Sequence, residues 1–298
     1  MGPLFGNAIT ADDPVYNYIQ GESGQTAKDA KMFTESLWKR YQPYADCNFV
    51  EQIRRDFNAR FWEMYLACTL MDKGYEITRK AKKNAGPDIR VKHKGNIIWI
   101  EATAPTSGDQ SSGDRVPELV ITNPPTAQRV SEEQIILRYR AAIKEKYDYK
   151  YFEYLKSEIM HGEDFYILAI NGCRVPFSKS DFNPPRIVRT VLPFGYPQVT
   201  INPVSTQIIS EGYQYSATIS KASGSTVQTD IFLDRNYKHI SAVLFSNADV
   251  FSLTKSMGDD FIIVHNPLAH PLPNDFPNFG QQWKAELRGN EVRLSLKG

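Results

Sequence analysis

The sequence has few cysteines and no strong excess of either charge. Its 298 residues contain three cysteines, Cys47, Cys68 and Cys173, which lie far apart. Their odd number and spacing exclude a zinc-type cysteine pattern and a paired disulfide framework, and they favour a reducing compartment. The formal net charge is only +1. Any surface for nucleic acid must therefore be a local basic patch that acidic surface elsewhere balances.

Long hydrophobic runs and several common catalytic motifs are also lacking. No apolar run reaches the ~18 residues of a transmembrane helix, and the first residues show neither the basic flank nor the apolar block of a signal peptide. The sequence contains no phosphate loop ending in Lys-Ser/Thr, no GxSxG elbow and no HExxH pair. With 41% hydrophobic and 23% charged residues, we expect a folded cytoplasmic protein without a membrane role.

Two acids lie on what the sequence predicts to be neighbouring strands. Residues 86–105, GPDIRVKHKGNIIWIEATAP, predict two strands joined by a tight turn, with Asp88 at the start of the first and Glu101 near the end of the second. Side chains alternate along a strand, so Glu101 shares a face with Trp99, while Ile100 points to the opposite face. Two acids placed in this way are typical of a divalent-metal site.

A third acid lies upstream, in residues 49–73, which predict one long helix ending at Gly74. The second half of this helix is apolar nearly all round, which indicates a buried helix, and Glu63 lies among the apolar residues. An unpaired carboxylate in such surroundings is costly. We therefore interpret Glu63 as a further acid of the site. The alternatives are a glutamate that pairs with Arg60 or one that faces solvent.

The order of elements predicts an α/β fold. A strand at residues 75–79 and the two acid-bearing strands follow the long helix, and a helix at 131–158 and a strand at 164–171 come next. Beyond residue 174 the sequence is rich in strand patterns, with two continuous apolar runs that suit strands added to the same sheet. We expect three parts: an N-terminal leader and helix (1–48), a core (49–174) and a β-rich extension packed on the core sheet (175–298).

These segments resemble the PD-(D/E)XK nuclease superfamily, which has the restriction endonuclease-like fold. Pro87-Asp88 is similar to its PD motif, and Glu101-Ala102-Thr103 is similar to its (D/E)XK motif. The resemblance implies an αβββαβ core with a mixed central sheet flanked by helices. It also implies that Asp88 and Glu101, supported by Glu63, bind Mg²⁺ or Mn²⁺. Thr103 stands where the family has a lysine that orients or activates water. The alternative is an α/β core whose acids merely occupy strand ends.

A cation from the following helix is a candidate to replace the missing lysine. The resemblance implies this option, because related nucleases place the lysine on that helix. Lys146 flanks the apolar stripe of residues 131–158 at 3.6 residues per turn and is our first candidate, with Arg138 the second. The alternative is that both are solvated charges on the exposed face of the helix.

Two further segments bear on substrate binding. Lys80, Lys82 and Lys83 lead into Asp88, and a basic segment there predicts salt-dependent contacts with phosphates, unless it is an ordinary solvated loop. Residues 104–130 form a connection much longer than usual and rich in Gly, Ser and Pro. This connection leaves the strand directly after Glu101. It is either a loop that closes over substrate or an insertion without a task.

The sequence therefore predicts a Mg²⁺-dependent endonuclease that hydrolyses phosphodiester bonds of DNA, which is favoured over RNA as substrate. Its predicted catalytic residues are Glu63, Asp88, Glu101 and Lys146, and the resemblance suggests a homodimer. A catalytically inactive protein that binds nucleic acid or a partner on the same fold is the first alternative. The second is an unrelated α/β protein in which Glu63 pairs with an arginine and the strand acids face solvent.

Overall fold

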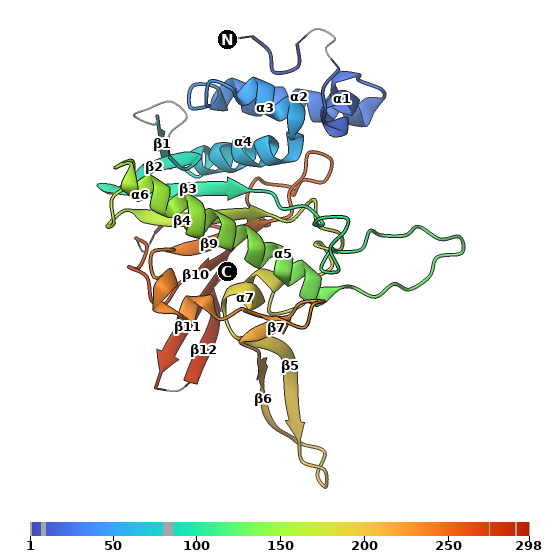
Figure 1. Cartoon of the computed structure of the whole chain (residues 1–298), viewed down its shortest axis with the longest axis vertical. Helices are drawn as coiled ribbons and strands as arrows, with labels where there is room; N and C mark the ends of the chain where they lie inside the picture. The colour runs from blue at the N-terminus through green and yellow to red at the C-terminus, as the bar shows by residue number, and fades with distance from the viewer. Residues whose placement is uncertain (1, 7–9, 80–85, 274, 290, 298) are drawn as a thin grey trace.

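One mixed sheet of eight strands runs through the protein, with helices against both of its faces (Figure 1). The structure is a computed structural model, and it describes residues 2–6, 10–79, 86–273, 275–289 and 291–297. The predicted α/β class, with a mixed central sheet flanked by helices, is confirmed. In spatial order the strands are β1 Glu76–Thr78, β2 Ile89–His93, β3 Asn96–Thr103, β4 Phe165–Asn171, β9 Ala242–Ser246, β10 Ile262–His265, β11 Gln281–Arg288 and β12 Glu291–Lys297.

The pairing of the strands explains how the chain crosses the sheet. β1, β2 and β3 form an antiparallel meander, whereas β3 pairs with β4, and β4 with β9, in parallel. A parallel pair requires a crossover connection, and α5 (Glu132–Glu145) supplies it between β3 and β4. Beyond β9 the sheet continues with β10, β11 and the closing β11–β12 hairpin.

The two faces of the sheet build two separate cores because side chains alternate along each strand. In β3, Ile98 and Ile100 belong to the core beneath α4 (Phe57–Asp72), while Trp99 belongs to the core beneath α5. The α4 helix is buried on nearly all sides, as its apolar sequence predicts. The indole Nε1 of its Trp62 donates to a β4 main-chain carbonyl at 3.1 Å and fixes the helix on the sheet.

Two helices predicted as continuous are interrupted. Residues 49–73 form two helices, α3 (Phe49–Arg55) and α4, because Asp56 leaves the helical conformation (φ −146°) and its side chain caps α4 by accepting from the Ala59 amide at 3.1 Å. Residues 131–158 form α5, a π-helical turn and a short α6. Such turns are frequent at functional sites. The bounds of the last two are η1 Lys146–Tyr151 and α6 Phe152–Lys156.

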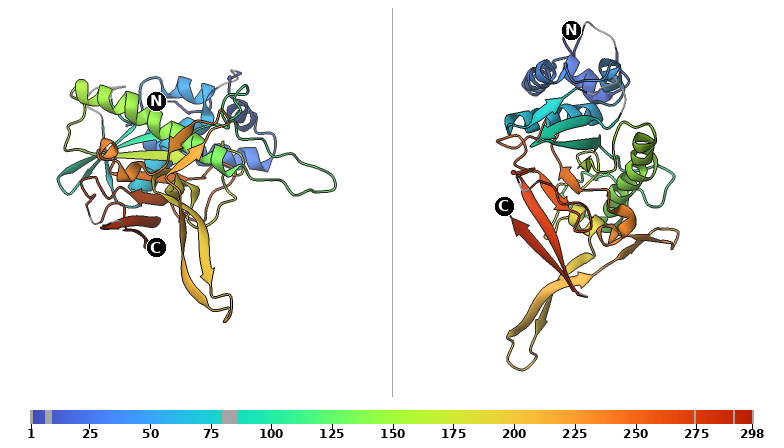
Figure 2. Two further views of the ribbon diagram at one scale, coloured as in Figure 1. Left: turned by 60° about the horizontal axis from the view of Figure 1, so that its bottom comes forward. Right: turned by 90° about the vertical axis from the view of Figure 1, so that its left-hand side faces the viewer.

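The other elements lie around this framework. The helix predicted within residues 1–48 is α2, and a shorter helix, α1, precedes it where the sequence indicated only a leader. The β5–β6 hairpin extends away from the body of the protein (Figures 1 and 2). In the described ranges, every helix is too short or too polar to span a lipid bilayer. The bounds are α1 Pro14–Gln20, α2 Gln25–Tyr41, α7 Arg186–Val191, β5 Phe194–Ile201, β6 Ile208–Tyr215, β7 Thr218–Ser220, β8 Thr226–Gln228, η2 Ile231–Leu233 and η3 Arg235–Tyr237.

The long connection between β3 and α5 has a packed part and a projecting part. Val116 is fully buried, and its amide donates to the Ser107 carbonyl at 2.9 Å, which folds the first part of the connection onto the protein. The later part extends outward as a loop (Figure 1), and Ile121 on it is 92% exposed. The packed part is thus a fixed wall next to α5.

A buried ion-pair network joins α5 to α7. Arg186 is 1% exposed and donates through Nε and Nη2 to the two carboxylate oxygens of Glu132, at 2.8 and 2.6 Å. Arg189 donates through Nη2 both to Glu132, at 3.0 Å, and to Asp181, at 3.1 Å. Two helices that are 40 or more residues apart in the sequence are held together by these bonds.

We expect Arg186→Ala to lower the free energy of unfolding by about 3–5 kcal/mol, because the change breaks a buried pair and leaves acidic groups undercompensated. Urea denaturation measures this loss. Arg288→Ala, which breaks an exposed pair with Glu286, is the matched control and should cost far less. Equal losses in the two variants would contradict a special contribution of the buried network.

Candidate functional site

Asp88 and Glu101 lie next to each other on β2 and β3. At the end of the β2–β3 pair farthest from the turn, Ile89 lies opposite Ile100. Asp88, one residue before β2, therefore lies opposite Glu101. The Asp88 Oδ2 atom accepts a hydrogen bond from the Ala102 amide at 2.7 Å. Glu101 is only 3% exposed, whereas the Asp88 side chain remains 15% exposed. Glu101 is thus buried on the α5 side of the sheet, and Asp88 is partly exposed.

Lys146 reaches Glu101 from the helix that follows β3. It is the first residue of η1, and its Nζ lies 2.7 Å from the Glu101 Oε1 atom. The hydroxyl of Tyr154 donates to the other carboxylate oxygen of Glu101 at 3.0 Å. Arg138, the second candidate, is engaged elsewhere, because its Nε donates to the Thr106 carbonyl at 2.9 Å. The structure thus brings Lys146, but not Arg138, to the acid pair.

Glu63 belongs to the same region and is linked to Asp88 through an arginine. It lies on α4, is 1% exposed, and accepts hydrogen bonds from the Tyr41 hydroxyl and from Arg60 Nη1. The same Arg60 nitrogen is 3.9 Å from Asp88 Oδ1. The pairing of Glu63 with Arg60, one of the alternatives raised by the sequence, is therefore present. We call Arg60, Glu63, Asp88, Glu101 and Lys146 the carboxylate cluster.

In the carboxylate cluster, the pKa values of Glu101 and Lys146 are both raised. Burial, and then the neighbouring Asp88 charge, raise the pKa of Glu101 to about 7, although Lys146 and Tyr154 oppose the shift. Burial alone would lower the pKa of Lys146, but the Glu101 and Asp88 charges outweigh it and raise that pKa. Both groups therefore hold their protons more tightly than usual, Glu101 chiefly because it is buried and Lys146 because two carboxylates lie near it.

The donors of the cluster fit a hard divalent cation. Mg²⁺ and Mn²⁺ prefer oxygen ligands, and Mg²⁺ is usually held by one or two carboxylates, which is what Asp88 and Glu101 offer. The negative charges of these two carboxylates would be partly neutralised by such an ion. Within the described ranges, no three His, Cys, Asp or Glu side chains come together as a metal-binding group. The set that the structure offers thus consists of two carboxylates, with Glu63 held apart by Tyr41 and Arg60.

Three tyrosines that sequence reasoning did not select lie at or near the site. Tyr41 and Tyr154 donate to Glu63 and Glu101, as described above. Tyr166 on β4 is fully buried, and its hydroxyl has no hydrogen-bond partner in the described part of the chain. Burial, and then the Glu101 charge, raise the pKa of Tyr166, which places its hydroxyl within electrostatic reach of that carboxylate. Helical periodicity groups Tyr154 with the apolar residues of 131–158, so periodicity alone does not reveal its polar contact.

The predicted contacts with nucleic acid lie mostly beyond what can be described. Lys80, Lys82 and Lys83 fall outside the described residues. Arg79, which precedes them, is exposed just after β1. On the neighbouring strand, the Arg90 guanidinium lies over the Trp99 ring, 5.5 Å from its centroid. This contact stabilises the pairing of β2 with β3. The role of the basic segment remains a prediction.

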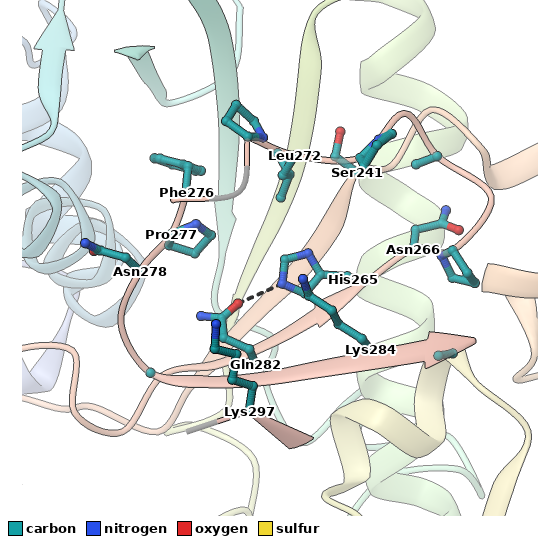
Figure 3. A pocket seen from close by; sticks show the side chains of 16 residues that line it. Ser241, His265, Asn266, Leu272, Phe276, Pro277, Asn278, Gln282, Lys284 and Lys297 are labelled. Atoms are coloured by element: carbon teal, nitrogen blue, oxygen red, sulfur yellow. Dashed lines mark hydrogen bonds between the residues drawn. The ribbon is translucent and has the colours of Figure 1, made fainter. Parts of the chain in front are cut away.

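A cavity of about 390 Å³ lies at β10 and β11 (Figure 3). Its lining includes His265, whose Nε2 is 2.7 Å from Gln282 Oε1, together with Lys284 and Lys297. None of the residues of the carboxylate cluster lines this cavity. The carboxylate cluster is therefore a candidate site because of its charges and hydrogen bonds. It does not lie in this cavity.

Comparison of the chain with family models, with curated proteins and with solved structures finds no match.

We expect Glu101→Gln to change how stability depends on pH. The folded-state pKa of Glu101, about 7, exceeds the ordinary value of 4.5, so the folded state binds more protons between these values. Stability is therefore lost as pH rises through this window. The variant cannot bind this proton. The Tm of the variant minus the Tm of the unaltered protein should therefore increase as the pH is raised from about 5 to about 8.

Thermal melts in EDTA across this pH range test the expectation. Glu286→Gln, at an exposed glutamate on β11, is the matched control and should melt in parallel with the unaltered protein. A melting profile for Glu101→Gln that is parallel as well would show that Glu101 does not bind a proton in this range.

Proposed function

We propose that the protein is a metal-dependent nuclease that hydrolyses phosphodiester bonds of DNA on a restriction endonuclease-like core. The observation that supports this most is the 2.7 Å contact between Lys146 and Glu101. It supplies a lysine beside the two strand acids, although position 103 of the motif is a threonine. The order of α4, the β1–β2–β3 meander, α5 and β4 is compatible with the αβββαβ core of that family.

In this proposal Asp88 and Glu101 hold Mg²⁺ or Mn²⁺. When bound, such an ion would polarise the phosphoryl oxygen and lower the pKa of the attacking water. Tyr154 holds one oxygen of Glu101 in place. Glu63 is a positioning residue, because it fixes Arg60, and Arg60 in turn faces Asp88. The carboxylates thus provide the ligands, and the surrounding hydrogen bonds set their orientation.

Lys146 would act as a cation at the reacting phosphate. Its raised pKa keeps the ammonium group charged at neutral pH, so it is a donor and not a base. A charged donor aimed at the place where negative charge develops stabilises the transition state. In the family that the sequence resembles, the lysine at the motif position occupied here by Thr103 would have this role.

DNA would approach along the basic segment that precedes Asp88. Lys80, Lys82 and Lys83 are at most eight residues from Asp88 in the sequence, so even a fully extended chain keeps them within roughly 28 Å of it. Contacts of these lysines with the backbone would make binding depend strongly on salt. A preference for DNA over RNA, and assembly as a homodimer, remain part of the proposal.

A binding protein without catalysis is the second candidate, and one observation favours it. Lys146 and Arg60 pair with Glu101 and Glu63 inside the chain, which compensates much of the buried charge without any metal. A protein of this kind would bind nucleic acid or a partner without cutting. The assay below separates the two candidates.

We expect the intact protein to cut plasmid and single-stranded DNA with Mg²⁺ or Mn²⁺, and EDTA to abolish cutting. Asp88→Asn, Glu101→Gln and Lys146→Met should each lower the rate by a factor on the order of a hundred or more, because each removes a group that acts on charge in the transition state. Gel analysis of cleavage products over time measures these rates.

Lys150→Met is the matched control. Lys150 lies on the same π-helical turn as Lys146, but it is half exposed and pairs with Glu153, so its variant should cut at the normal rate. DNA binding without cutting, together with the absence of metal binding in calorimetry, would reject the nuclease in favour of the binding protein. Cutting that survives in Asp88→Asn and Glu101→Gln would place the chemistry elsewhere.

A further inference from the structure

A second cavity, of about 480 Å³, lies on another side of α5. Its walls are α5, the packed part of the β3–α5 connection and the β7–β8 hairpin, and β7 lies beside α5 (Figure 1). Five cationic side chains line it against two acidic ones. The cations are Arg115, Arg138, Arg140, Lys144 and Lys221, and the acids are Asp109 and Asp114.

Arg140 is the buried member of this set. It is 5% exposed, and its Nε and Nη2 donate to the Gln228 carbonyl at 3.0 Å and to the Tyr237 hydroxyl at 2.7 Å. Its guanidinium also lies 5.0 Å from the centroid of the Tyr237 ring. The remaining Nη1 is buried and has no hydrogen-bond partner in the described part of the chain. A buried charged donor without a partner is costly, and a ligand in the cavity would satisfy it.

Arg115 pairs with Glu118 at 2.9 Å, whereas the other three cations of the cavity have no carboxylate partner in the described part of the chain. Within the described ranges, Arg138, Lys144 and Lys221 form no ion pair, and the two lysines are exposed. The two acids have other partners, because Asp109 accepts from Ser111 at 2.8 Å and Asp114 accepts from the Ala222 amide at 2.6 Å. The cavity therefore has more positive charge than its own carboxylates neutralise.

This cavity is distinct from the carboxylate cluster although both use the same helical segment. Residues 144 and 146 are two positions apart, which turns their side chains by about 200° around a helix. Lys146 accordingly points to Glu101 on the sheet, while Lys144 lines the cavity. No residue of the carboxylate cluster lines the cavity.

We propose that this cavity binds a phosphate monoester, with Arg140 Nη1 as the buried donor and Lys144 and Lys221 at the rim. Arginine donors match phosphate oxygens in geometry and charge. The volume falls in the range of small-molecule sites, which suits a ligand of mononucleotide size. The proposal is independent of phosphodiester hydrolysis, since it requires neither a metal nor cleavage.

Titration calorimetry in EDTA tests binding with three probes: inorganic phosphate, adenosine 5′-monophosphate and adenosine. We expect phosphate and the monophosphate to bind and adenosine not to bind. A second pair, a short oligonucleotide with a 5′-phosphate and the same oligonucleotide with a 5′-hydroxyl, separates a strand end from a free nucleotide as the source of the phosphate. Equal affinity for the monophosphate and adenosine would overturn the proposal.

Two variants locate the binding. Arg140→Gln should weaken binding of the monophosphate by a factor of about ten or more, because it removes a charge-assisted donor. Lys144→Gln combined with Lys221→Gln should weaken it as well, and these exposed positions keep the test valid if the buried change prevents folding. Lys28→Gln, at an exposed lysine of α2, is the control and should bind normally. Unchanged affinity in the double variant, or an equal loss in the control, would refute a site in this cavity.

Discussion

A carboxylate buried against a sheet needs cationic or hydrogen-bonding partners, and the structure depends on meeting this need at Glu101. It occupies a face of β3 that is otherwise filled by large apolar residues such as Trp99. Its two oxygens accept from Lys146 and from Tyr154, and both donors come from the continuation of the helix that crosses over from β3 to β4. The crossover therefore does more than connect two parallel strands, because its far end supplies the groups that hold the buried acid.

The same segment separates two regions of opposite charge. On the side facing the sheet lies the carboxylate cluster, in which acids outnumber bases. On another side lies the cavity lined by Arg138, Arg140 and Lys144, in which cations outnumber acids. Each region therefore attracts a ligand of the opposite charge. A cation suits the first, and a phosphate suits the second.

Several features of the fold and of the site could be predicted from local sequence. The alternation of β3 assigns Glu101 to the Trp99 face, and the two residues share it in the structure. The position of Lys146 beside an apolar stripe made it the first candidate for a cation at the site, with a solvated position as the alternative, and in the structure it contacts Glu101. The break at Asp56 was missed because a good N-cap residue inside an apolar pattern has no signal that separates it from a helical aspartate. The π-helical turn at Lys146 was missed because α-helical periodicity assumes a constant turn.

The sequence by itself determined the α/β class, the alternation of the strands, and the acids and cations available to a site, because these depend on periodicity and composition along a short stretch of chain. Only the tertiary structure decided which groups meet. Glu63 is paired with Tyr41 and Arg60, and Glu101 with Lys146. Such pairings depend on where separate elements pack against one another. Because burial removes the water that would otherwise solvate each charge, a buried charge without a partner would destabilise the fold.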